Sequence, residues 1–307
     1  MTRIIVGAEA STRSEDAVAF ARRIAEASGA QITLAGVYPY EDHPSRAASN
    51  AYRDYLRDDA QTTLDRLRDG LDGAGHVATV AIADVSPARA LQELAEREGA
   101  DLIVLGSSHR GKLGRVLAGT TAERLLHGAP CPVAVVPHGF NTGADTPIET
   151  IAVGHDGSDE AGAALAAAVV TSQALGTALR VVRVFSPTDY GRPAVAFGFA
   201  TVMPSDDLQG LAQQGLDKTM EALPEGVEAE SVLVTGDPVR DLVDQSTRAD
   251  LLFLGSRGYG PHRAVLLGSV SGRVVCDAAC PVIVVPRGVD APLAELFRVR
   301  ASSSVAS

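Results

Sequence analysis

The chain is poor in cysteine, short of positive charge, and without a long apolar run. Three cysteines are too few for a disulfide framework, and because Cys131 and Cys280 each precede a proline in matching contexts, we interpret them as core residues of a cytoplasmic protein. Lys and Arg total 27 against 38 Asp and Glu, and the net charge of −11 argues against nucleic acid as a partner. No run approaches the roughly 20 apolar residues of a membrane helix, and Met1-Thr2-Arg3 leads directly into a predicted strand, so neither membrane association nor a signal peptide is expected.

Familiar catalytic motifs are also missing. Gly111-Lys112 is followed by Leu113 and lacks the earlier glycine of a P-loop, and no G-x-G-x-x-G follows a predicted strand. The histidines are scattered without metal-ligand spacing, and no Ser/His/Asp or Cys/His set is indicated. We therefore expect no catalytic residues, no protein-held metal and no enzymatic activity.

What the chain does contain is an internal repeat. The matching pairs are 3–11 with 150–158, 99–106 with 248–255, and 129–137 with 279–286. The offset is 147 positions between Gly7 and Gly154 and 149 between Gly106 and Gly255. The repeat predicts two domains of about 145 residues each, at 1–139 and 148–287. The tail, residues 288–307, is expected to be disordered.

Each half shows the same alternation of apolar strands and amphipathic helices. The strands are expected near 4–7, 32–37, 77–83, 102–105 and 133–136, and again near 151–154, 180–184, 228–234, 251–254 and 282–285. In the first half the helices are expected at 15–27, 51–71, 88–97 after Pro87, and after Gly119. This order predicts an α/β fold in which each half is a five-stranded parallel sheet with helices on both faces.

The position of the polar turns constrains the strand order. Polar or glycine-rich turns follow strands 1 and 4 of each half, and they can share a ligand only if these strands are neighbours. The order 3-2-1-4-5 satisfies this condition and places the crevice between strands 1 and 4 at the topological switch point. The sequence therefore predicts two Rossmann-like domains with a ligand site at that crevice.

A glycine-rich stretch follows strand 4 of the second half. Leu251–Leu254 runs into Gly255-Ser-Arg-Gly258, and nine residues later Gly268-Ser269 opens a helix. Glycines past a strand end let a ligand approach the backbone, and a helix start offers free N–H groups to an anion. A related stretch runs from Gly106 to Thr120. This pattern indicates phosphate binding.

With the turn at 153–158, Val-Gly-His-Asp-Gly-Ser, this spacing resembles the universal stress protein family in its tandem two-domain form. The resemblance covers about 1–139 and 148–287 and implies an adenine nucleotide alpha hydrolase-like fold of the ATP-binding subgroup. It implies that Asp156 binds the ribose and that the backbone at Val184 contacts the adenine. It also implies that Val270 contributes a backbone N–H to phosphate binding. The glycine motif that it assigns to the triphosphate consists of Gly255, Gly258, Gly268 and Ser269.

The first domain departs from this pattern. Glu9 replaces the aspartate, Ala10 replaces the following glycine, and His109 stands where Gly258 stands in the second domain. A histidine is bulky for a position of close approach, although as a donor it can itself meet a phosphate. At the remaining positions the first domain has residues equivalent to the contacts implied for the second domain, and these are Val37, Gly106, Gly119 and Thr120. Nucleotide binding in the first domain is therefore left open.

The leading interpretation is an ATP-binding regulatory protein of stress adaptation. One alternative is a weak ATPase or phosphotransfer enzyme, in which Ser269 or Thr120 contacts the γ-phosphate and a divalent ion such as Mg²⁺. A second alternative is a structural dimerisation module with empty sites. ADP, AMP or a cyclic nucleotide would make similar ribose and adenine contacts, so these ligands stay open as well.

The fifth strands predict association. Val133–Val136 and Val282–Val285 would be apolar edge strands unless they pair, so we expect the halves to form an internal pseudo-dimer. A homodimer of chains is also expected. The apolar insert at 193–203 in the second half can form a partner surface, a lid over the nucleotide, or a core-packed loop.

Overall fold

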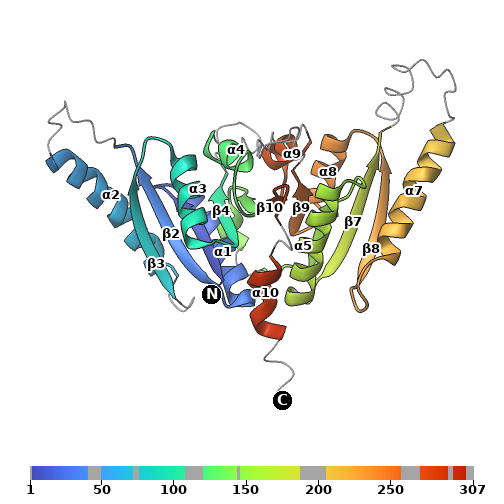
Figure 1. Ribbon diagram of the computed structural model, residues 1–307, viewed down its shortest axis with the longest axis horizontal. Coiled ribbons are helices and arrows are strands. Elements are labelled where there is room, and N and C mark those ends of the chain that lie inside the picture. Colours follow the sequence, from blue (N-terminus) through green and yellow to red (C-terminus); the bar gives the residue numbers. More distant parts are fainter. Residues whose placement is uncertain are drawn as a thin grey trace.

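A computed structural model describes residues 2–40, 50–71, 76–107, 120–143, 146–186, 205–256, 270–289 and 293–301 (Figure 1). The apolar insert at 193–203, an expected partner surface or lid, lies outside these residues. The elements of the first half are β1 (Arg3–Ala8), α1 (Thr12–Ser28), β2 (Gln31–Tyr38), α2 (Asn50–Asp69), β3 (Val77–Ala83), α3 (Pro87–Glu98), β4 (Leu102–Gly106), α4 (Thr120–Leu126), β5 (Val133–Val136) and the 3-10 helix η1 (Phe140–Gly143).

The second half repeats this succession and adds one helix at its end. Its elements are β6 (Thr150–Gly154), α5 (Asp159–Leu175), β7 (Ala178–Phe185), α7 (Ser205–Glu221), β8 (Ala229–Thr235), α8 (Pro238–Ser246), β9 (Leu251–Gly255), α9 (Ser271–Asp277), β10 (Val282–Val285) and α10 (Ala294–Ala301). The predicted strands agree with the observed ones to within two residues at their ends, because apolar runs and turn residues mark them clearly.

The strands form one ten-stranded sheet in the order β3-β2-β1-β4-β5-β10-β9-β6-β7-β8. Within each half all pairs are parallel, which confirms the predicted order 3-2-1-4-5. The halves meet at β5 and β10, which pair antiparallel with Ala134 opposite Ile283. The expected pairing of the two fifth strands is therefore confirmed, and it joins the two sheets into one (Figure 1).

Successive side chains of each strand point to opposite faces of the sheet, so a hydrophobic core forms on each face. In β1, Ile4 and Val6 pack on one face, and Ile5 packs on the other. The first face is covered by α1, α2, α5, α7 and α10, and the second by α3, α4, α8 and α9. Both faces of the central strands β4, β5, β9 and β10 are thus buried, as expected for a parallel sheet covered by helices, whereas the outer strands β3 and β8 are partly exposed.

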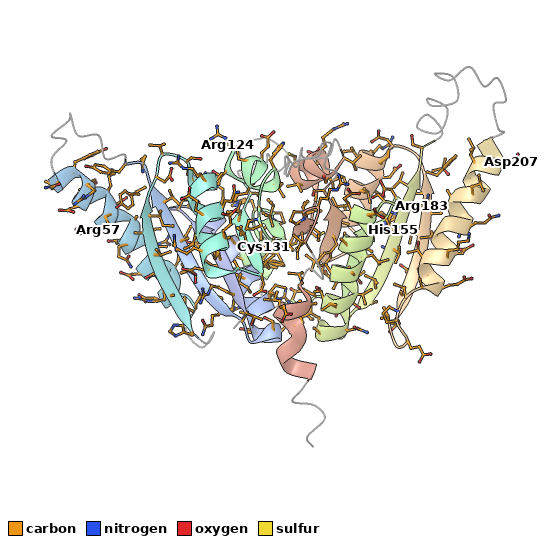
Figure 2. The ribbon with its side chains drawn as sticks, viewed as in Figure 1. Arg57, Arg124, Cys131, His155, Arg183 and Asp207 are labelled. Atoms are coloured by element: carbon orange, nitrogen blue, oxygen red, sulfur yellow. The ribbon has the colours of Figure 1, made fainter. Side chains whose placement is uncertain are left out.

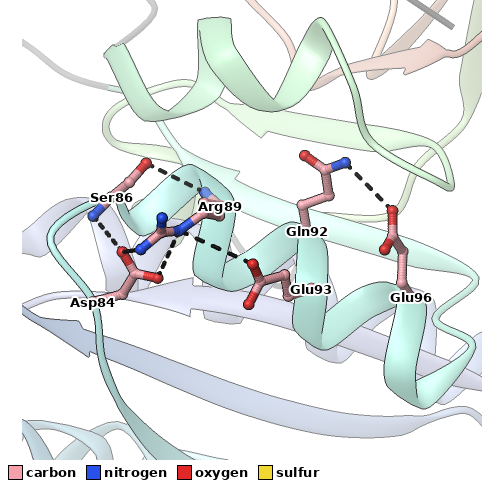
Figure 3. A network of polar contacts seen from close by, with 6 residues as sticks. All are labelled: Asp84, Ser86, Arg89, Gln92, Glu93 and Glu96. Carbon is pink, nitrogen blue, oxygen red and sulfur yellow. Dashed lines mark hydrogen bonds and ion pairs between the residues drawn. The ribbon is translucent and has the colours of Figure 1, made fainter.

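The start of α3 shows how local chemistry fixes a helix beside the first pocket. The buried carboxylate of Asp84 accepts hydrogen bonds from Arg89 Nε and Nη2 at 3.0 and 2.8 Å, and one from the Ser86 backbone N–H at 2.7 Å (Figure 3). The Ser86 side chain in turn accepts from the Arg89 N–H as the N-cap, and Pro87 takes the first helical position. This arrangement confirms the helix start predicted at Pro87.

The expectation of a wholly disordered tail is wrong for its helical part. The helix α10 lies between α1 and α5 (Figure 1) and contacts both of them. Leu293, Leu296 and Phe297 are all buried, and their i, i+3, i+4 spacing gives the short helix one apolar face. The burial of these three side chains in the groove between α1 and α5 provides the stabilisation that a polar tail would lack.

None of the helices in the described ranges is long and apolar enough to cross a membrane.

Candidate functional site

A cavity of about 450 Å³ opens at the carboxyl ends of β6, β7 and β9 in the second half. Asp156 follows β6, Val184 lies near the end of β7, Gly255 ends β9, and Val270 precedes α9. All four line this one cavity. The sequence predicted each of them from a different part of the chain, and the switch point of the sheet brings them together. The predicted contacts Gly258, Gly268 and Ser269 lie outside the described residues.

Asp156 organises the turn after β6. Its Oδ1 accepts hydrogen bonds from the Ser158 backbone N–H at 3.0 Å and from the Ser158 hydroxyl at 2.5 Å. Gly157, between them, has φ of +90°, a conformation that favours glycine. Ser158 also caps α5 by accepting from the Ala161 N–H. The turn therefore presents an exposed carboxylate at the rim of the cavity.

His155 and Ser271 are among the polar lining residues that the sequence analysis did not predict as ligand contacts. His155 Nδ1 and Ser271 Oγ are buried, and neither has a hydrogen-bond partner among the residues that the structure describes. Burial lowers the pKa of His155, and Arg183 lowers it further, while the charge of Asp156 acts in the opposite direction. A neutral imidazole and a hydroxyl thus face the cavity with unused hydrogen-bonding capacity.

Arg183 is another lining residue that the sequence analysis did not predict. It lies on β7, which pairs with β6, the strand that His155 directly follows (Figure 2). A Cβ at Gly157 would lie 3.7 Å from Arg183 Nη1, and one at Gly215 would lie only 2.6 Å from it. The missing side chain at Gly215 leaves room for the guanidinium. Arg183 is the only arginine or lysine in the described lining of this cavity.

Gly255 and Gly106 have a packing role besides the predicted one. A Cβ at Gly255 would overlap the backbone carbonyl of Glu160 in the first turn of α5, and one at Gly106 would overlap the carbonyl of Arg13 in α1. Each glycine therefore lets a helix start lie directly against a strand end. Only glycine fits at these positions, whether or not a phosphate also approaches there.

The first half has a smaller cavity at the equivalent place, of about 140 Å³. The predicted residues Glu9, Val37 and Gly106 line it. Thr120 begins α4, but its side chain is outside the described part of the chain; the described residues Thr121 and Ala122 of the same helix line the cavity. His109 and Gly119 lie outside the described residues.

Glu9 is held by its own neighbours. Its carboxylate accepts a hydrogen bond from the Ser11 hydroxyl at 3.1 Å and pairs with Arg13 Nη1 at 3.3 Å. Its backbone N–H donates to Ser14 Oγ at 2.8 Å. The first cavity is thus smaller than the second, at about 140 against 450 Å³. Its acidic residue, Glu9, also forms an ion pair with Arg13, which lines the same cavity.

The repeat shows which other lining residues differ. With the offset of 147 positions found at the first strand of each half, Arg13 corresponds to Glu160. With the offset of 149 positions found at the fourth strand, Ala122 corresponds to Ser271. All four residues line their respective cavities. The two sites thus share a fold position but differ in charge and in polar groups.

The geometry defines a class: two fused doubly wound α/β domains, each with a cavity at its switch point. A sequence model described as the universal stress protein family matches residues 1–137 and 147–286. The chain belongs to this family.

Two relatives and one solved structure agree with this assignment. A universal stress protein of Mycolicibacterium smegmatis is 31% identical over 298 residues, which cover 92% of this chain and 96% of the relative. One of Mycobacterium tuberculosis is 36% identical over 185 residues, and this match spans only 61% of that relative and 60% of this chain. The crystal structure of a universal stress protein from Archaeoglobus fulgidus superposes with a TM-score of 0.70 at 20% identity, covering 93% of this chain and 98% of that one. That likeness concerns the fold.

Proposed function

We propose that this chain is an ATP-binding regulatory protein of stress adaptation, with its nucleotide in the second domain. The observation that carries the proposal is the common cavity of Asp156, Val184, Gly255 and Val270, the four described residues predicted to contact a nucleotide there. Its volume of about 450 Å³ falls within the range of about 300–1,000 Å³ for small-molecule sites. The buried Ser271 hydroxyl without a partner gives independent support, because such groups are uncommon unless a ligand or water meets them.

The proposed binding mode assigns each group a role. The exposed carboxylate of Asp156 accepts hydrogen bonds from the ribose hydroxyls, and the backbone at Val184 meets the adenine edge. The backbone N–H of Val270 and the glycine-rich stretch that begins at Gly255 face the phosphates. In the described lining His155 Nδ1 has no hydrogen-bond partner, so no serine is paired with a histidine base there, and the proposal includes slow turnover or none.

For the first domain we propose that the site holds no nucleotide. A cavity of about 140 Å³ is below the usual range for such ligands. In addition, the ion pair with Arg13 and the hydrogen bond from Ser11 both fall on Glu9 Oε1, so a ribose hydroxyl would compete with them for that oxygen. One nucleotide per chain follows from this proposal.

The test is the nucleotide content of freshly purified protein after denaturation, identified by chromatography against ATP, ADP, AMP and cyclic AMP. We expect about one adenine nucleotide per chain. After removal of nucleotide, calorimetric titration should show one ATP site, and Asp156→Ala should weaken it at least about tenfold, since hydrogen bonds to a carboxylate contribute about 1.5–3 kcal/mol.

The matched control is Glu9→Ala, which removes the equivalent carboxylate from the first domain and should leave ATP affinity unchanged. Two nucleotides per chain, one of them lost in Glu9→Ala, would show that the first domain binds as well. No nucleotide and no uptake of ATP would contradict the proposal and leave a structural module. Release of phosphate at a rate that Asp156→Ala abolishes would instead support the enzymatic alternative.

A further inference from the structure

A carboxylate lines the second cavity beside Gly255, where the glycine-rich stretch begins. Glu160 belongs to the first turn of α5, and its backbone carbonyl contacts Gly255. Its side chain is only 14% exposed and lines the cavity together with Gly255 and Val270. Under the proposed function, this is where the phosphates of the nucleotide lie. A carboxylate beside a polyphosphate is repelled unless a cation lies between them.

A buried hydroxyl lines the same cavity. Ser271, the first residue of α9, is 4% exposed, and its Oγ has no hydrogen-bond partner within the described residues. It directly follows Val270, whose backbone N–H is one of the proposed phosphate contacts. In nucleotide sites, a serine or threonine hydroxyl and a carboxylate are the protein groups that commonly hold Mg²⁺ beside the phosphates.

The first domain has exchanged both residues. Where the second cavity has Glu160, the first has Arg13, and where the second has Ser271, the first has Ala122. An arginine supplies a fixed positive charge and cannot ligate a cation, and an alanine offers no ligand atom. At these two equivalent positions the acidic residue and the hydroxyl are therefore present together in the second cavity and absent together from the first, as expected if they serve one purpose.

The described contacts leave Glu160 able to meet a cation. Its Oε1 pairs with Arg287 Nε at 3.4 Å, but the Arg287 side chain is 57% exposed. An ion pair with so exposed a partner is weak and is readily exchanged. The residue equivalent to Arg287 in the first half, His138, pairs with Asp16 instead. Arg287 thus supplies positive charge to Glu160 in the absence of a metal ion.

We propose that the second domain binds its nucleotide together with Mg²⁺, and that the Glu160 carboxylate and the Ser271 hydroxyl are the protein ligands of this ion. The inference rests on the proposed nucleotide site. Phosphate oxygens and water molecules complete the coordination, as is usual for Mg²⁺, which rarely has a cage made of protein alone. Accordingly, no three His, Cys, Asp or Glu side chains gather as a metal set in the parts of the chain that are described.

The experiment compares ATP affinity in MgCl₂ and in EDTA by calorimetric titration of the nucleotide-free full chain. The wild type should bind at least about tenfold more tightly with Mg²⁺. Glu160→Gln and Ser271→Ala should each reduce this ratio by about fivefold or more. Glu160→Arg, which installs the residue of the first domain, should bind ATP about equally well in both solutions. Mn²⁺ bound in the ternary complex should show a changed electron paramagnetic resonance spectrum in Glu160→Gln.

Asp159→Asn is the matched control, because it removes the same charge from the same helical turn at an exposed residue outside the cavity lining. Its Mg²⁺-to-EDTA ratio should equal that of the wild type. Far-ultraviolet circular dichroism checks that each variant folds, and the isosteric Glu160→Gln keeps the test valid if Glu160→Arg does not. An unchanged ratio in both Glu160→Gln and Ser271→Ala would overturn the assignment while leaving the nucleotide site intact. Failure of the wild type to bind ATP in either solution would instead contradict the proposed function.

Discussion

Gly255 lies directly against the backbone carbonyl of Glu160, so that the end of β9 and the first turn of α5 touch without an intervening side chain. The first half repeats this contact between Gly106 and Arg13. The contact sets the distance between the helix start and the strand end in each domain. Each cavity is lined by both members of its pair, so its shape depends on this close packing.

Gly255→Ala should therefore destabilise the fold. The new methyl group would overlap main-chain atoms that cannot rotate away, and overpacking of this kind costs about 1–3 kcal/mol or more. Gly162→Ala, in α5, is the control, because nothing lies within 4 Å of its Cβ position and alanine favours a helix by about 1 kcal/mol. Thermal denaturation should show a lower Tm for the first variant and an equal or higher Tm for the second. Equal Tm values for Gly255→Ala and the wild type would show that α5 can shift.

Leu296→Ala should reveal the contribution of α10 to stability. Leu296 is fully buried in the groove between α1 and α5, and removal of a buried leucine side chain costs about 2–5 kcal/mol. Leu211, which is 50% exposed on α7, gives a control in which the same substitution should cost about 0.5 kcal/mol or less. Urea denaturation followed by circular dichroism measures both. A Leu296 variant as stable as the control would mean that α10 does not dock in solution.

His155 should make stability depend on pH. Burial lowers its pKa below the ordinary value of 6.5, so the unfolded chain takes up a proton that the folded chain resists. Its contribution is complete above pH 6.5 and is lost as pH falls toward the lowered pKa. His155→Asn should therefore show a shallower fall of Tm below pH 6.5 than the wild type. His76→Asn, at an exposed histidine, is the control, and a wild-type slope in His155→Asn would contradict the assignment.

The cysteines should differ in reactivity. Burial raises the pKa of both Cys131 and Cys280 to about 12, with smaller contributions from the charges of Asp101 and Asp250. Since the thiolate is the reactive form, neither should react with a thiol reagent near neutral pH. Cys276 is only half-buried. We expect one labelled cysteine in the folded chain and three in denaturant, counted by mass spectrometry; rapid labelling of all three in the native state would contradict this expectation.

Much of the fold could be predicted because the repeat and the spacing of apolar residues can be recognised in short stretches of the sequence. The run Val282–Val285 and its counterpart Val133–Val136 indicated both the strands and their need for a partner, and the structure pairs them. The tail could not be predicted in the same way. Leu293, Leu296 and Phe297 form an apolar face only one turn long, and its burial depends on a groove formed by two helices distant in sequence.

The site shows the same limit. Gly255 could be found because glycine spacing after a strand marks it in the sequence, and Asp156 could be found because the turn at 153–158 resembles the family motif. Arg183 is adjacent to the predicted Val184, yet strand alternation directs it to the other face, where the missing side chain at Gly215 leaves room for its guanidinium. Ser271 follows the predicted Val270, but its burial without a partner arises from packing that no local pattern records.

The antiparallel join of β5 and β10 has a consequence for how the two sites can diverge. In a symmetric homodimer the two subunits have the same sequence, so any substitution appears in both sites at once. Here one covalent chain holds the halves in a fixed one-to-one ratio at every concentration, and the sheet keeps them together. The two sites of one chain can therefore differ in sequence, and the first has Arg13 and Ala122 where the second has Glu160 and Ser271. Selection can thus act on each cavity separately.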